Sequence, residues 1–139
     1  MTFPRVVLGL TGAVFVTLGL GFLVAPEGLL GLMKIQVSPE RALLEIRAMY
    51  GGLELGLGVF FIVAVFRERW IRAALGAQFL VLGGMGSTRL LALLFAGRSD
   101  RLMVAFAVAE VIGAVLGIGA FGQARRILVN NRFERRRVD

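Results

Sequence analysis

Residues 6–24 read VVLGLTGAVFVTLGLGFLV and contain no charged side chain. A helix needs about 20 apolar residues to cross the hydrocarbon core of a bilayer, so this stretch is long enough to span a membrane. Three stretches of similar length follow at residues 46–66, 73–96 and 102–122. They lack the regular alternation of polar and apolar residues that membrane barrel strands need. The sequence therefore predicts an all-α fold, a bundle of four transmembrane helices.

The composition favours a membrane protein and excludes several kinds of chemistry. Hydrophobic residues make up 58% of the 139 positions before the 19 glycines are added, whereas soluble proteins reach about 45–50% with glycine included. The chain has neither cysteine nor histidine, which excludes disulfides, thiolate nucleophiles, histidine bases and Cys/His metal sites. We expect no cofactor, no bound metal and no catalytic residue. An intramembrane enzyme that uses Glu54 or Glu110 as an acid or base is the least favoured hypothesis.

The segments between the spans carry helix boundaries and the charges that orient a membrane protein. Ser38-Pro39-Glu40 is typical of a helix start, residues 26–37 suggest a short segment on the membrane surface, and residues 97–101 suggest a polar hairpin. Ten basic residues fall at the end that holds both termini and residues 67–72, against four at the other end. The positive-inside rule therefore predicts that both termini face the cytoplasm. We expect a transmembrane domain over residues 1–123 and a basic cytoplasmic tail over residues 124–139.

Small residues recur every four positions on three of the spans. They are Gly9, Ala13, Thr17 and Gly21 on the first, Gly52 and Gly56 on the second, and Ala105, Ala109, Gly113 and Gly117 on the fourth. Small residues at this spacing let helices approach closely in lipid, so we expect these faces to pack. Residues 117–122 match G-x-G-x-x-G, but the match lies inside an apolar span without the strands of a dinucleotide site. We therefore interpret these glycines as packing residues.

Five charged residues within or near the spans are the strongest functional signal. They are Glu45, Arg47, Glu54, Arg89 and Glu110. A charge at a helix centre costs about 2.5–3.5 kcal/mol on insertion, so such groups face a protein interior and pair. Arg47, Arg89 and Glu110 fall eight or nine residues inside one end of their spans, and Tyr50, Gly51, Glu54 and Gly58 share the helical face of Arg47. We expect Arg47, Tyr50, Glu54, Arg89 and Glu110 to form a ligand-binding layer.

Two interpretations of this layer stay open. It is either a network of ion pairs that fixes helix register, or a pocket for a small molecule or lipid, because two arginines suit an acidic ligand or a lipid headgroup. Glu45 faces the other way, alongside Gly52 and Gly56, and we expect these three residues to form an interface. The best functional hypothesis is a binding or transport module. The alternative is a non-catalytic accessory subunit or a homo-oligomeric structural membrane protein.

Residues 45–58 read EIRAMYGGLELGLG. This stretch resembles the signature of a bacterial family of small four-helix membrane proteins catalogued as a domain of unknown function, and more remotely resembles DoxX-type four-helix membrane proteins. The resemblance covers most of the chain and implies the fold and a location in the bacterial cytoplasmic (inner) membrane. It implies no reaction or substrate. The expected partners are the lipid bilayer, an anionic lipid or acidic small molecule, and another membrane protein or a second copy. We do not expect nucleic acid, since orientation explains the basic residues.

Overall fold

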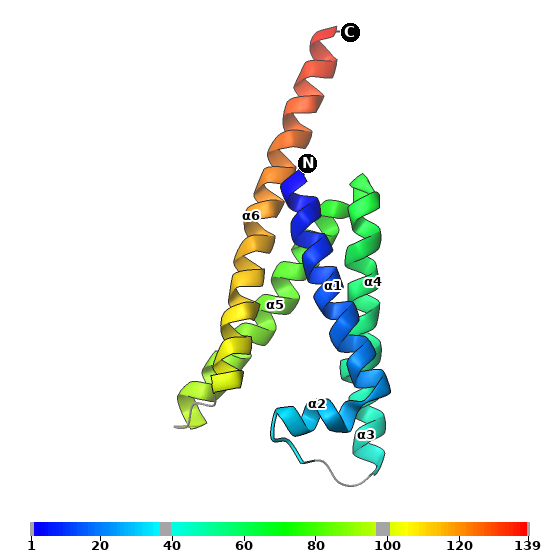
Figure 1. The fold of residues 1–139 in the computed structure, drawn as a ribbon. Helices are drawn as coiled ribbons and strands as arrows, with labels where there is room; N and C mark the ends of the chain where they lie inside the picture. The colour runs from blue at the N-terminus through cyan, green and yellow to red at the C-terminus, as the bar shows by residue number, and fades with distance from the viewer. Residues whose placement is uncertain (1, 37–39, 97–100, 139) are drawn as a thin grey trace. The chain divides into compact units, whose positions relative to one another are not determined.

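The computed structural model describes residues 2–36, 40–96 and 101–138, with side chains at 2–36, 41–95 and 101–126. Its elements are α1 (Thr2–Val24), α2 (Pro26–Leu32), α3 (Glu40–Ile46), the π-helical segment η1 (Arg47–Gly52), α4 (Leu53–Phe66), α5 (Glu68–Ala96) and α6 (Arg101–Val138) (Figure 1). No strand occurs within these ranges. The predicted all-α fold class is confirmed.

Four helical stretches are long and apolar enough to cross a membrane, as predicted. They are Thr2–Val24, Arg41–Phe66, Glu68–Phe95 and Arg101–Arg126. The second combines α3, η1 and α4 without a break. Of the expected helix start at residues 38–40, only Glu40 lies among the described residues, and of the hairpin at 97–101 only Arg101 does; each is the first residue of a helix. Helix α6 continues to Val138, past residue 124 where we expected a separate tail to begin.

The chain divides into two compact units, and each is described by itself. Gly9–Val63 form one, here called the α1–α4 unit, and Met1–Leu8 with Ala64–Asp139 form the other, the α5–α6 unit. The candidate site residues are split between them.

Four glycines bring α1 against η1 and α4 within the α1–α4 unit. Gly12 lies opposite Gly58, and Gly19 lies opposite Gly51, so two glycines seven residues apart on one helix meet two on an antiparallel partner. A Cβ atom at Gly58 would lie 2.7 Å from the backbone nitrogen of Val16 and 2.9 Å from the carbonyl oxygen of Gly12. The two backbones therefore approach too closely for any side chain at this position.

The packing face predicted for the first span is observed only in part: Gly21 lies against Leu29, where a Cβ atom would come within 2.9 Å of Cδ1, but two other residues do not pack. Ala13 and Thr17 are exposed, and the Thr17 hydroxyl donates a hydrogen bond to the Ala13 carbonyl of its own helix, 2.9 Å away. From residue 9 to the end of α1, the buried residues alternate glycine with phenylalanine: Gly12, Phe15, Gly19 and Phe22. Phe15 packs edge-on against Phe61 with ring centroids 5.6 Å apart. Large rings fill the space between the glycine contacts, and a ladder of small residues alone would leave that space empty.

The segment between the first two spans contains a short helix, α2, which lies crosswise at the end of α1 (Figure 1). Pro26 occupies its first turn, where a missing N–H costs nothing. The helix ends with Lys34 in the left-handed region at φ 56°. The amide of Ile35 donates to the Leu30 carbonyl and that of Lys34 to the Gly31 carbonyl, which is the Schellman arrangement.

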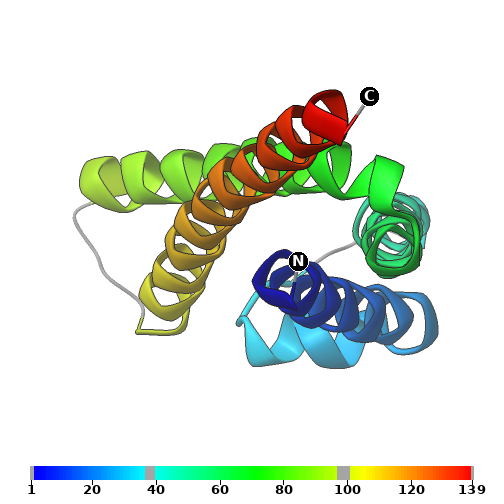
Figure 2. The same ribbon diagram turned by 90° about the horizontal axis from the view of Figure 1, so that it is seen from above.

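Helices α5 and α6 form an antiparallel hairpin in the other unit (Figure 2). Gly117 lies against Gln78 and Phe79, Gly113 against Leu82, and Gly86 against Glu110 and Val111. Of the ladder predicted on the fourth span, Gly113 and Gly117 therefore do pack. Ala105 and Ala109 are exposed, and the buried alanines are instead Ala107, Ala114, Ala120 and Ala124.

Candidate functional site

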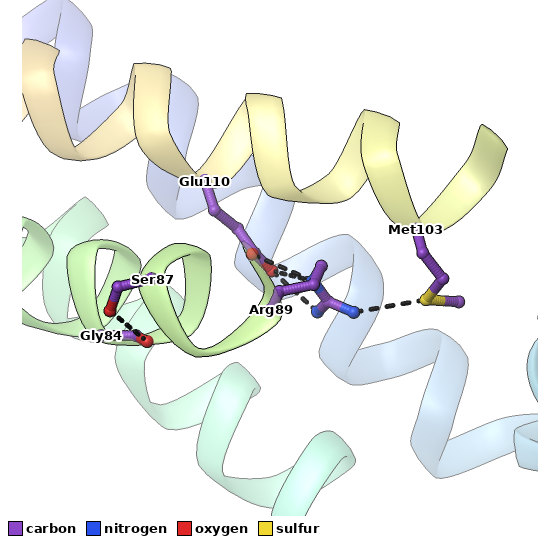
Figure 3. A network of polar contacts seen from close by, with 5 residues as sticks. All are labelled: Gly84, Ser87, Arg89, Met103 and Glu110. Atoms are coloured by element: carbon purple, nitrogen blue, oxygen red, sulfur yellow. Dashed lines mark hydrogen bonds and ion pairs between the residues drawn. The ribbon is translucent and has the colours of Figure 1, made fainter. Parts of the chain in front are cut away.

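The centre of the candidate site is a two-pronged contact between Arg89 on α5 and Glu110 on α6 (Figure 3). The Arg89 Nε donates to both carboxylate oxygens, at 3.2 Å to Oε1 and 3.0 Å to Oε2, and Nη2 donates to Oε1 at 2.8 Å. Such charge-assisted, bidentate hydrogen bonds are the strong kind, and they fix the plane of the guanidinium group. These two predicted site residues thus come together.

Two further side chains of α6 surround the Arg89 guanidinium. Its Nη1 donates to the sulfur of Met103 at 3.5 Å, and its central carbon lies 5.6 Å from the centre of the Phe106 ring. Met103, Phe106 and Glu110 are spaced three and four residues apart, so they share one face of α6. Neither Met103 nor Phe106 was among the site residues predicted from the sequence. Their spacing relative to Glu110 was the signal that could have identified them.

Close helix packing positions the pair. A Cβ atom at Gly86 would lie 3.2 Å from the Glu110 Cβ and 3.3 Å from the backbone nitrogen of Val111. Gly86 lies one helical turn before Arg89 on α5, and because it has no side chain, Glu110 can enter the interface between the helices. Ser87, two residues before Arg89, donates to the Gly84 carbonyl of its own helix at 3.1 Å (Figure 3).

The two charged side chains differ in their exposure. The Glu110 side chain retains 10% of its accessible surface, and the Arg89 side chain retains 29%. The carboxylate is therefore enclosed, whereas part of the arginine stays open to its surroundings.

Gln78 is a second polar group inside the hairpin. It is fully buried, and its Nε2 donates to the Gly113 carbonyl at 2.9 Å. Its Oε1 accepts no hydrogen bond from the residues that the structure describes. Gln78 was not among the site residues predicted from the sequence.

The π-helical segment holds Arg47 and Tyr50 in the α1–α4 unit. The Leu53 amide donates to the Ala48 carbonyl, five residues earlier, instead of four as in an α-helix. Tyr50 is half exposed at 51% and packs on Phe22 with ring centroids 5.3 Å apart. Such segments occur often at functional sites because they change the direction in which side chains leave a helix.

Because of this segment, the residues that regular helical spacing placed on one face of the second span differ in their burial. Gly51 and Gly58 are buried against α1, Glu54 is half-buried, and Arg47 and Tyr50 are exposed. The extra residue in the turn breaks the 3.6-residue period on which the prediction of one shared face rested. Because Arg47, Tyr50 and Glu54 belong to one unit and Arg89 and Glu110 to the other, the convergence of all five stays a prediction.

The three expected interface residues, Glu45, Gly52 and Gly56, are all exposed. A Cβ atom at Gly56 would meet nothing within 4 Å, and one at Gly52 would meet only the Arg47 carbonyl at 3.9 Å. Their role as an interface stays a prediction.

The arrangement suits recognition of an anion better than catalysis. Both oxygens of the Glu110 carboxylate are already engaged by Arg89. Within the described residues, no three acidic side chains gather as a metal site would require. Guanidinium groups bind carboxylates and phosphates through paired hydrogen bonds, and Arg89 already makes such a pair.

Comparison with known proteins gives a family without a function. No curated protein and no solved structure matches the chain. A family described only as a domain of unknown function matches residues 3–121, which include all four spans except the ends of the first and last. This confirms the resemblance drawn from residues 45–58 at the level of the family. The chain therefore belongs to the family Domain of unknown function (DUF4345).

Proposed function

We propose that this protein is a binding or transport module of the bacterial cytoplasmic membrane that recognises a small molecule or lipid through an anionic group. Arg89 is the primary recognition residue, and Glu110 holds it in place. A ligand-binding role for Arg47, Tyr50 and Glu54 on the second span stays a prediction from the sequence. A remote DoxX-like relationship and cytoplasmic termini belong to the same proposal.

The observation that carries the proposal is the difference in exposure within the pair. In a pair that only holds two helices together, enclosing both partners would give the stronger attraction. Here the Glu110 side chain is 10% exposed, whereas the Arg89 side chain is 29% exposed. The Phe106 ring and the Met103 sulfur limit the movement of the guanidinium group, and an anion could approach the part of the side chain that stays exposed.

The test compares molecules that copurify with the protein. The wild-type chain and the double variant Arg89→Leu/Glu110→Leu are purified from the same membranes, and bound lipids and metabolites are identified by mass spectrometry. We expect an anionic species that is retained by the wild type and lost from the double variant. The variant Arg5→Leu/Glu68→Leu removes an exposed ion pair of 3.0 Å and serves as the control. Identical bound species in all three proteins, with the double variant folded, would end the proposal.

Homo-oligomerisation is a second candidate, favoured by the open surface at Gly52 and Gly56. Small exposed residues four apart on a membrane helix are typical of contacts between helices. Gly56→Leu should then shift the protein to a smaller species on size exclusion in mild detergent. An unchanged profile at several detergent concentrations would contradict this role.

A further inference from the structure

The α5–α6 unit carries a second charged feature at the opposite end of the hairpin from Arg89. It consists of arginines at or just before the start of α5 and arginines of α6 beyond Phe121. The exposed arginines here are Arg67, Arg69, Arg72, Arg125 and Arg126. We call them the arginine patch.

Contacts within the unit bring the two helices together at this patch. The central carbon of Arg72 lies 5.6 Å from the centre of the Phe121 ring, across from α5 to α6. Phe121 and Arg125 are four residues apart and so share a face of α6. Arg72 and Arg125 therefore lie on neighbouring parts of one surface, although 53 positions separate them in the sequence.

The acidic residue nearest the patch is already engaged. Glu68 accepts a hydrogen bond from Nη2 of Arg5 at 3.0 Å. Among the described side chains of this unit, the other acidic group is Glu110, which is bound to Arg89. The patch therefore keeps its positive charge.

An aromatic residue marks the depth of the patch. Trp70, the only tryptophan in the chain, is 37% exposed, and the Arg69 guanidinium lies 5.8 Å from its ring centre. Tryptophan is enriched at the level of lipid headgroups, and Trp70 lies three residues into a helix able to cross the membrane. The arginines thus occur where the phosphates of a bilayer would lie.

We infer that the arginine patch is a binding site for the phosphate group of an anionic phospholipid. Arg69 and Arg72 supply paired donors that match phosphate geometry. The Trp70 and Phe121 rings hold these two side chains, and the apolar surface below accommodates acyl chains. The inference shares with the proposed function only the location in a membrane, and it does not involve Arg89 or Glu110.

A simple topology anchor is the competing explanation, and substitution by lysine separates the two. Lysine keeps the positive charge that orients a membrane protein, but it loses the planar fork and the stacking of arginine. A topology anchor therefore tolerates Arg69→Lys/Arg72→Lys, whereas a phosphate site does not. Arg101→Lys, at the far end of the same hairpin, is the matched control.

The experiment measures phospholipid binding to purified protein in detergent by native mass spectrometry, with phosphatidylglycerol and phosphatidylcholine as probes. We expect phosphatidylglycerol to bind more tightly than phosphatidylcholine. Arg69→Lys/Arg72→Lys should weaken that binding by tenfold or more, and Arg101→Lys should not. Phe121→Leu should weaken it about two- to fivefold, the equivalent of a cation–π contact of about 0.5–1 kcal/mol, and Phe95→Leu at the far end of α5 should have no effect.

Several outcomes would overturn the inference. Equal binding of the two lipids, or full binding by the lysine variant, would leave only a topology anchor. Displacement of phosphatidylglycerol by an equal concentration of inorganic phosphate would show that the site does not select lipid. Fractionation of whole cells tests the membrane location, which the inference shares with the proposed function, and a chain released from membranes by salt alone would refute that location. The lipid titration tests the arginine patch itself.

Discussion

Removing Arg89 alone should destabilise the protein more than any other single change at the candidate site. In Arg89→Leu, the Glu110 carboxylate loses the donors at 2.8, 3.0 and 3.2 Å. With only 10% of its side-chain surface exposed, it has little access to water as a replacement. Breaking a buried ion pair by removing one partner costs about 3–5 kcal/mol, and we expect a loss of that size.

The reverse variant should cost less, because the partner it leaves behind is more open. In Glu110→Leu, the stranded Arg89 side chain is 29% exposed and keeps its contacts with Met103 and Phe106. We expect a loss of about 1–3 kcal/mol, as for an unsatisfied buried group. The double variant should fall within about 1 kcal/mol of the wild type, because apolar replacement of a whole buried pair is often neutral or stabilising.

Unfolding in mixed detergent micelles, followed by the fluorescence of Trp70, provides the four free energies of this cycle. The exposed pair Arg5–Glu68 is the control, with side chains 41% and 68% exposed. Arg5→Leu should cost no more than about 1 kcal/mol. Equal losses for Arg89→Leu and Arg5→Leu would refute the reasoning. So would a double variant whose loss equals the sum of its two single variants.

Three further changes test the packing and orientation. Gly58→Leu should destabilise the α1–α4 unit by about 1–3 kcal/mol because no space exists for its Cβ atom, whereas Gly28→Leu, where a Cβ atom meets nothing within 4 Å, should leave the unfolding free energy unchanged; equal effects in the same unfolding assay would contradict the close approach of α1 and α4. Gln78→Leu should change the unfolding free energy by less than about 1 kcal/mol, because it removes both a hydrogen bond of 2.9 Å and a buried acceptor without a partner among the described residues, and these two effects offset each other. A loss well above that would mean that Oε1 has a partner in the folded protein. A cysteine at position 99 should react with an impermeant thiol reagent in intact cells, and labelling only after lysis would reverse the predicted orientation.

Hydropathy was sufficient to predict the helical class and the four spans, because a long uncharged run such as residues 6–24 has few alternatives to a membrane helix. Counting residues inward from the span ends also placed Arg89 and Glu110 at matching depth. On two regular helices of a hairpin, equal distance from the turn means equal height, since each residue advances the axis by a fixed rise.

Other features depend on details that a pattern of apolar residues does not contain. The π-helical turn at residues 47–52 changes the hydrogen-bond partner by one residue and leaves the hydropathy almost unaltered. The prediction that Ala13 and Thr17 lie on the packing face of α1 failed because small residues are frequent on every side of that helix. Gly12 and Gly19 form the close contacts of α1 because the neighbouring Phe15 and Phe22 rings are buried on the same face.

The positions of the polar contacts suggest why charged groups are retained within the α5–α6 hairpin. Lipid tails are as apolar as leucine, so apolar packing alone gives little preference for one vertical register of two membrane helices over another. Along this hairpin, Arg72 meets Phe121, Gln78 meets Gly113, and Arg89 meets Glu110. A slip of one turn would move each partner about 5.4 Å and would break all three contacts together. Polar contacts at three depths therefore specify the register, and one of them, the contact between Arg89 and Glu110, is also the proposed anion site.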